Sequence, residues 1–270
     1  MDTPLRLTPS PRQKIWGKTR LSPWFPNSSQ PIGEVWFLAD RDLPLLVKLI
    51  FTSERLSVQV HPDDGEDGPR GKTEMWHILE AEPGASIALG FREPLTRRRL
   101  AESARTGEIE GLLNWVPVKA GETYFTPAHT VHAIGAGIVL CEIQQHSDVT
   151  YRLWDYGRPR ELHVDQAVPI AELGVHPGAA HVIHVGPGRH ELVRCCHFVT
   201  ELVTLPAEAQ EVMEAEKSQL WICLEGSGRI GDREFGKSEV WLMPGDGQPQ
   251  PAIRAREPAR FLRTYVPAPA

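Results

Sequence analysis

The sequence predicts a mainly β protein, built as a sandwich or barrel of antiparallel strands with one helical insertion. Short alternating or continuous apolar runs recur along the whole chain, as half-buried and buried strands require. Turns rich in proline and glycine separate these runs, and the chain holds 24 prolines and 23 glycines. Only one segment shows helical spacing. Many short strands at such intervals are typical of a sandwich or barrel.

The predicted strands follow one another from the N-terminal to the C-terminal end with little between them but turns. In chain order they cover residues 33–40, 45–51, 56–60, 75–79, 85–91, 123–127, 133–144, 149–156, 198–205, 219–230 and 238–246. The run 45–51, "LLVKLIF", is continuously apolar apart from one lysine, whereas 56–60, "LSVQV", alternates with a period of two. The first pattern indicates a buried strand and the second a strand with two different faces.

The segment 93–116, "EPLTRRRLAESARTGEIEGLLNWV", interrupts the strand pattern. Its apolar residues recur at near-helical spacing, and Pro94 or Thr96 could open a helix. The residues that show this spacing are Leu95, Leu100, Ala104, Ile109, Leu112 and Leu113. We therefore expect a helical insertion over 93–116.

Two β units are expected. Residues 1–166 form the first, with the helical insertion inside it, and 190–270 form a second, smaller one. Between them, 167–189 lacks periodicity and is rich in glycine, proline and histidine, which is typical of a linker. The second unit has no histidine after His197, so we expect no metal site there.

Composition excludes several classes of protein. The chain is 41% hydrophobic and 24% charged, with a net charge of −6, which argues against nucleic acid as the main partner. No apolar run approaches the length of a membrane span, and the N-terminal residues lack the apolar core of a secretory signal. The four cysteines form no C-x-x-C pair. A cytoplasmic location is expected.

A candidate metal site lies in residues 56–78, "LSVQVHPDDGEDGPRGKTEMWHI". The period of two places Gln59 and His61 on one face of a strand. Glu74 follows 13 residues after His61, and His132 begins a later strand. Two nitrogen ligands, a carboxylate and an amide oxygen describe a catalytic zinc site with room for water or substrate, since structural zinc sites usually use cysteine.

The segment "GETYFTPAHTVH" resembles the second cupin motif, with His129 where that motif usually carries glycine. "LSVQVHPDD", "GKTEMW", "TVHAIGAGIVLCEIQQHSDVTYRLWDYGR" and "RELHVDQA" together resemble type I mannose-6-phosphate isomerases (phosphomannose isomerases) of the short bacterial kind. The resemblance covers roughly residues 12–167. It implies a cupin jelly-roll β fold whose second, smaller unit is degenerate and without metal.

The resemblance also implies the reaction and its residues. One zinc ion would be held by Gln59, His61, Glu74 and His132, next to Lys72 as a residue of the substrate pocket. Arg152, in "TYRLWDYGR", falls at the family's catalytic arginine and is a candidate contact for the phosphosugar. The implied reaction interconverts mannose 6-phosphate and fructose 6-phosphate by metal-assisted proton transfer between C1 and C2.

The residues leave alternatives open. The general base could be a metal-bound water, His77 or another carboxylate of the pocket. Arg152 and Lys72 could each bind phosphate or stabilise charge that develops in the reaction. His61, Glu74 and His132 could also serve a cupin dioxygenase, and a non-catalytic phosphosugar-binding cupin is a third interpretation. The two cations and the extra Gln59 favour the isomerase.

Overall fold

The structure, a computed structural model of the chain, describes residues 3–212, 214, 216–245, 247–248 and 251–268. Within that part of the chain the fold is mainly β, as expected, and its strands pair antiparallel in four sheets. None of the described helices is long and apolar enough to cross a membrane.

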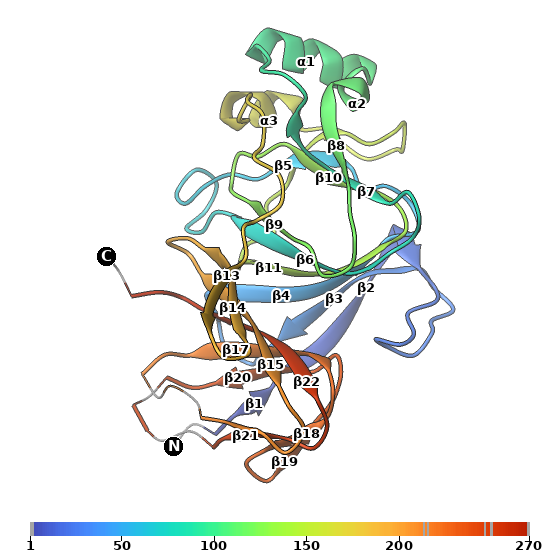
Figure 1. The fold of residues 1–270 in the computed structure, drawn as a ribbon. Coiled ribbons are helices and arrows are strands. Elements are labelled where there is room, and N and C mark those ends of the chain that lie inside the picture. Colours follow the sequence, from blue (N-terminus) through green and yellow to red (C-terminus); the bar gives the residue numbers. More distant parts are fainter. Residues whose placement is uncertain (1–2, 213, 215, 246, 249–250, 269–270) are drawn as a thin grey trace.

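The first half of the chain forms two sheets (Figure 1). The six-stranded sheet contains, in spatial order, β2 (Thr8–Lys18), β3 (Ile32–Leu38), β4 (Leu45–Phe51), β11 (Ile138–Gln145), β6 (Glu74–Ala81) and β9 (Thr123–Thr126). The five-stranded sheet contains β12 (Tyr151–Trp154), β5 (Val58–Val60), β10 (His132–Ile134), β7 (Ser86–Phe91) and β8 (Leu113–Pro117).

The second half forms a seven-stranded and a four-stranded sheet. The seven-stranded sheet contains β1 (Leu5–Arg6), β20 (Val240–Met243), β17 (Gln219–Glu225), β22 (Ala259–Tyr265), β15 (Val199–Leu205), β14 (Arg189–Arg194) and β13 (Ile183–Gly186). The four-stranded sheet contains β16 (Gln210–Glu211), β21 (Ile253–Ala255), β18 (Gly228–Ile230) and β19 (Arg233–Phe235). Because β1 pairs with β20, the N-terminal residues join the second half, although the expected first unit included them.

The helices lie at one end of this stack of sheets, at the top of Figure 1. Helix α1 (Arg97–Thr106) begins after Thr96, whose side chain accepts a hydrogen bond from Arg99 N at 3.2 Å. It ends at Gly107, which has a left-handed φ of 86°, and both features are standard helix caps. α2 (Ile109–Leu112) follows, but the last residues of the expected insertion belong to β8, because they pair with β7.

The expected linker 167–189 contains regular structure. The end of α3 (Val164–Ile170) lies in it, and so does β13. The segment between them forms single bridges to both sheets of the first half, Gly90 with Val175 and Tyr124 with Ala179. Backbone pairing of this kind holds the segment against the first half even though its sequence lacks periodicity.

The central strands of the six-stranded sheet, β4, β11 and β6, are buried on both faces. On one face Trp76 and Ile78 pack against Ile87 and Leu89 of the five-stranded sheet. On the other face its side chains pack against the seven-stranded sheet of the second half. Strands covered on both faces read as continuous apolar runs, which explains why every residue of β4 is buried.

Candidate metal centre

Three polar side chains form a row across the inner face of the five-stranded sheet. Gln59 of β5 pairs with His132 of β10 on one side and with Arg152 of β12 on the other. Directly opposite residues of antiparallel strands point to the same face of a sheet. The register therefore brings together residues that are separated by up to 93 positions in the chain.

The candidate ligands His61, Glu74 and His132 meet between the two sheets. Their ligand atoms all lie within 4.8 Å of one another, and each residue is at most 1% exposed. His132 Nε2 lies 3.4 Å from Glu74 Oε1, and His61 Nε2 lies 3.6 Å from Glu74 Oε2. The structure thus places three of the four expected ligands in one buried cluster.

The backbone sets the protonation of both histidines. His61 Nδ1 lies 2.9 Å from the Val149 carbonyl, and His132 Nδ1 lies 2.8 Å from the Thr130 carbonyl. Because a carbonyl only accepts hydrogen bonds, each Nδ1 carries the proton and each Nε2 offers a lone pair. Both Nε2 atoms face Glu74, which is the arrangement that second-shell carbonyls produce in metal sites.

Burial favours the neutral forms of all three candidate ligands, and for the two histidines the neutral form is the one that binds a cation. It lowers the pKa of His132 to about 3, with help from the Lys72 charge, and lowers the pKa of His61 well below its usual 6.5 for the same two reasons. Burial and the neighbouring Glu142 raise the pKa of Glu74 to about 7. Glu74 Oε1 is buried and accepts no hydrogen bond from any described residue. Lone pairs that face one another in this way fit a divalent cation.

Gln59 lies at this cluster with its amide nitrogen toward it. Gln59 Nε2 is 3.2 Å from His132 Nε2, while Gln59 Oε1 accepts a hydrogen bond from Ser57 at 3.2 Å. An amide binds a hard cation through its oxygen. Ligation by Gln59 therefore requires its amide group to turn over, which exchanges two groups of nearly the same shape.

Lys72 supplies a positive charge next to the cluster. Its ammonium group hydrogen-bonds Glu74 and lies 2.9 Å from His61 Nε2. Burial opposes a charge on Lys72, but Glu74 and Glu142 outweigh that effect and raise its pKa. Lys72 is only 4% exposed, so it acts as a buried, protonated donor rather than a loop cation in solvent.

A buried ion pair at the same site was missed by the sequence reasoning. Lys48 Nζ donates to Glu142 Oε1 at 3.0 Å, and Trp76 Nε1 donates to Glu142 Oε2 at 3.1 Å. Glu142 Oε1 also lies 3.9 Å from Lys72 Nζ. The signal for this pair was present in "LLVKLIF" and "IVLCEIQQ", where one charged residue interrupts a buried apolar run. Such a residue needs a partner.

Arg152 is held in place by hydrogen bonds to residues that follow it in the chain. Its Nη1 donates to the Glu161 carbonyl at 2.6 Å, and its backbone N donates to His163 Nδ1 at 3.1 Å. Its Nε is buried and has no hydrogen-bond partner among the described residues. Burial and the nearby Arg160 lower its pKa, yet an arginine stays charged. The guanidinium therefore keeps an N–H group free to donate a hydrogen bond, and Arg152 lies on the same sheet face as Gln59.

His77 belongs to a different environment. Alternation along β6 puts it on the face opposite to Glu74, and its Nδ1 lies 2.9 Å from the Thr123 hydroxyl. Burial lowers its pKa to about 4. These contacts set it apart from the candidate ligands, so His77 is a packed histidine of the sheet rather than a member of the metal cluster.

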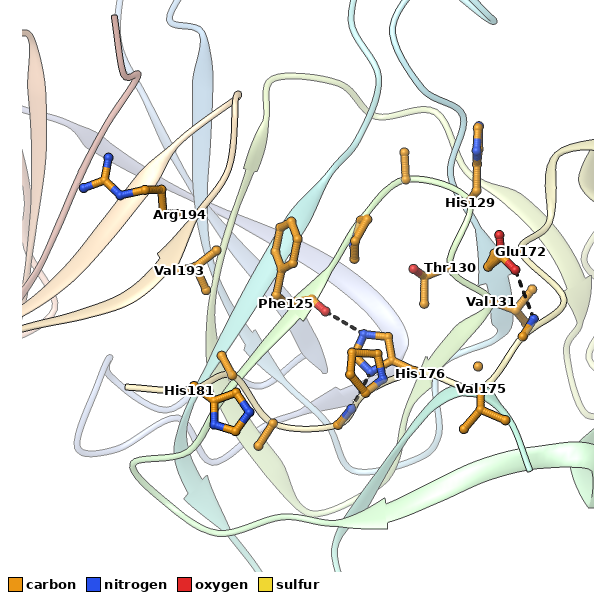
Figure 2. Close-up of a pocket in the computed structure, with 18 of the residues that line it drawn as sticks. Phe125, His129, Thr130, Val131, Glu172, Val175, His176, His181, Val193 and Arg194 are labelled. Carbon is orange, nitrogen blue, oxygen red and sulfur yellow. Dashed lines mark hydrogen bonds between the residues drawn. The ribbon is translucent and has the colours of Figure 1, made fainter. Parts of the chain in front are cut away.

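A mainly apolar cavity lies apart from these residues. It measures about 550 Å³ and is lined by residues 127–131, 172, 174–181 and 192–194, among others. Figure 2 shows His176 in its wall, where the ring donates to the Phe125 carbonyl at 2.8 Å. None of the candidate ligands lines this cavity. The histidines of the expected linker that reach it, His176 and His181, do not belong to the cluster of His61, Glu74 and His132.

Comparisons with known proteins place this chain in a family. No family model matches the chain. Mannose-6-phosphate isomerase ManA from Bacillus subtilis is 32% identical, over 89% of this chain and 93% of its own length. Mannose-6-phosphate isomerase from Streptococcus mutans is 34% identical, over 64% of this chain and 69% of its own length.

Solved structures of mannose-6-phosphate isomerases have a fold similar to that of this chain. A mannose 6-phosphate isomerase from Bacillus subtilis superposes with a TM-score of 0.86 at 27% identity and covers 97% of this chain and 99% of its own. A mutant of phosphomannose isomerase from Salmonella typhimurium superposes with a TM-score of 0.78. At 17% identity this second likeness shows the fold alone, and it covers 98% of this chain and the whole of the other. The chain belongs to the mannose-6-phosphate isomerase family.

Proposed function

We propose that this chain is an aldose–ketose isomerase that interconverts mannose 6-phosphate and fructose 6-phosphate with the help of one zinc ion. The observation that carries the proposal is the set of buried acceptors, His61 Nε2, His132 Nε2 and the Glu74 carboxylate, beside the buried ammonium of Lys72. The relatives named above support the substrate and the reaction.

Zinc is the proposed metal because two imidazoles and one carboxylate are ligands that it prefers. Gln59 completes the proposed set through its amide oxygen. When bound, the cation would polarise the sugar carbonyl and stabilise the charge that develops on its oxygen. The rest of the chemistry depends on the chain's own side chains.

Lys72 and Arg152 are the proposed contacts for the anionic substrate. Lys72 donates from a fixed, buried position, and a hydrogen-bond donor of that kind stabilises negative charge on a substrate oxygen in the transition state. Arg152 lies on the same sheet face as Gln59, and a guanidinium can hold two oxygens of a phosphate or an enediolate. Two cations beside the metal cluster favour a phosphosugar over the dioxygenase alternative.

Lys48 and Glu142 are a second pair of buried charged residues, next to Lys72. Burial alone would raise the pKa of Glu142, but Lys48 and Lys72 outweigh it and lower this pKa to about 2. Glu142 therefore stays ionised, and its charge favours the protonated form of Lys72. We propose that this pair maintains the charge of Lys72 while the proton moves between C1 and C2 of the sugar.

We also propose a cytoplasmic location, because the described cysteines are all free thiols, which suits a reducing compartment.

The function is tested by incubating the zinc-loaded protein with mannose 6-phosphate in D₂O and following the sugar by proton NMR. Formation of fructose 6-phosphate supports the isomerase. Binding of mannose 6-phosphate without conversion would favour the binding module, and oxygen uptake would favour the dioxygenase.

A further inference from the structure

The segment 62–71 connects the candidate ligand His61 to Lys72. It forms turns rather than strands, and its tip is exposed to solvent. We propose that Gln145 and Asp64 form a clip that holds the base of this segment closed and so positions Lys72 and Glu74 for the reaction. The effect of the clip on catalysis rests on the proposed function, whereas the clip itself does not.

Gln145 contacts both sides of the segment at once. It ends β11 and is 5% exposed. Its Nε2 donates to Asp64 Oδ1 at 2.8 Å, while its Oε1 accepts from Thr73 N at 2.9 Å. Its backbone N also donates to the Thr73 carbonyl at 3.1 Å. One buried amide group therefore joins the residue between Lys72 and Glu74 to the start of the loop.

Asp64 closes the loop from the other side. The same Oδ1 accepts a second hydrogen bond, from Gly71 N at 2.7 Å. Next to it, Lys72 N donates to the Pro62 carbonyl at 3.0 Å. The Gly71 amide is the main reason that the pKa of Asp64 lies below its usual value, with a further contribution from Gln145. Asp64 is thus an ionised acceptor that ties the two ends of the loop together.

Thr73 extends the connection to the third ligand. Its hydroxyl accepts a hydrogen bond from Ala128 N at 3.1 Å, and residue 128 lies in the short loop that leads to His132. The clip therefore fixes the backbone on both sides of Lys72 and links the segments that carry the three candidate ligands. None of the hydrogen bonds of the Gln145 side chain goes to a candidate ligand, so its role is that of a positioning residue.

An amide is required at position 145 because it must donate at one end and accept at the other. In a Gln145→Glu variant, one oxygen can still accept from Thr73 N. The other oxygen faces Asp64, and two carboxylates at hydrogen-bond distance repel each other. Replacing Asp64 as well, by Asp64→Asn, restores a donor opposite Glu. Because the same Oδ1 accepts from Gln145 and from Gly71 N in the wild type, this amide then offers no oxygen to Gly71 N. The pair of changes therefore reverses the direction of one hydrogen bond.

The test compares zinc-loaded wild type, Gln145→Glu and Gln145→Glu/Asp64→Asn. Gln219→Glu is the matched control, since Gln219 is a buried glutamine of the second half whose Oε1 also accepts hydrogen bonds. Isomerisation kinetics give kcat and KM, and amide hydrogen exchange reports on the N–H groups of Gly71 and Thr73. Metal content and thermal unfolding are measured for each protein.

The proposal predicts that Gln145→Glu lowers kcat roughly 10- to 100-fold at full metal loading with little change in KM, because small displacements of catalytic groups have effects of that size. Exchange at Gly71 and Thr73 should rise about tenfold or more. The double variant should recover most of the loss in kcat and most of the protection at Thr73 but not the protection at Gly71, whose acceptor it lacks, and Gln219→Glu should show no loss of either kind.

Wild-type exchange at both amides in Gln145→Glu, or a wild-type kcat despite faster exchange, overturns the proposal. Failure of Asp64→Asn to restore kcat and the protection of Thr73 in the double variant also overturns it. If the wild type itself converts no sugar phosphate, the proposed function fails separately. The exchange data then still decide whether the clip exists.

Discussion

Gln59 and His132 lie directly opposite each other on β5 and β10, with their Nε2 atoms 3.2 Å apart. Arg152 lies opposite Gln59 on its other side. This register places a candidate ligand, an amide that can complete the ligand set and a cation in one row, so the candidate site depends on how three strands pair and not on any single motif.

Glu74→Gln should abolish tight metal binding. Its carboxylate is the anionic member of the cluster. Mutating a residue that only hydrogen-bonds a metal ligand lowers metal affinity roughly 10- to 100-fold. Mutating the ligand Glu74 itself should therefore lower the affinity for zinc by more than that. Equilibrium dialysis with zinc measures the effect. His77→Gln is the control, because His77 lies on the opposite face of the same strand. Tight zinc binding by Glu74→Gln would exclude Glu74 as a ligand.

Lys48→Met should destabilise the fold by about 3–5 kcal/mol, because it leaves Glu142 buried without its closest cation. Lys48→Met/Glu142→Gln should regain a large part of that loss. Urea unfolding of the metal-free proteins measures both. Arg98→Met, in the exposed pair with Glu102, should cost less than about 1 kcal/mol. Equal losses for Lys48→Met and Arg98→Met would contradict the pairing.

The same pair predicts a dependence on pH. The pKa of Glu142 is depressed to about 2 in the folded protein, against about 4.3 for an unpaired glutamate. A depressed carboxyl pKa contributes stability above the unfolded value, and this contribution is lost as the pH falls from about 4.3 toward 2. Unfolding measured between pH 7 and pH 3 should show the difference between wild type and the double variant shrink at the acidic end.

Arg152→Lys should lower kcat/KM for mannose 6-phosphate roughly 100-fold. A lysine keeps the charge but loses the planar pair of donors, and removing one donor to developing charge has an effect of about this size. Arg6→Lys, in an exposed ion pair with Glu239 of the second half, is the control for the same substitution. Unchanged kinetics in Arg152→Lys would remove Arg152 from the proposed site.

Gly107→Ala should destabilise the protein by about 1–3 kcal/mol. Gly107 has a φ of 86°, and an added Cβ would lie 2.7 Å from Trp154 Cζ2, so the change brings both backbone strain and overpacking. Gly111→Ala, with open space around its Cβ position, should be neutral or stabilising. Thermal unfolding compares the two, and equal melting temperatures would show that the helix end tolerates alanine.

Much of the architecture could be predicted from local sequence. Alternation in "LSVQV" and the turn residues between apolar runs led to the mainly β fold of the family, which the structure and the comparisons confirm. The capping by Thr96 and the helical spacing after it correspond to α1 and α2. The helical insertion was expected to include residues 113–116, but these residues form β8 because they pair with β7.

Contacts between distant strands could not be read in the same way. Lys48 and Glu142 are 94 positions apart, and their meeting depends on the register of β4 with β11. The pairing of β1 with β20 depends likewise on an open sheet edge in the second half. The orientation of the Gln59 amide also depends on a neighbour, Ser57, and on the His132 tautomer, neither of which a motif specifies.

The most direct test of the central claim is a coupled assay of the purified protein with mannose 6-phosphate, before chelation, after chelation and after zinc is added back. We predict turnover that the chelator abolishes and that about one zinc ion per chain restores, with no recovery in Glu74→Gln. A fully zinc-loaded wild type that forms no fructose 6-phosphate, or turnover that persists in the metal-free protein, would contradict the claim.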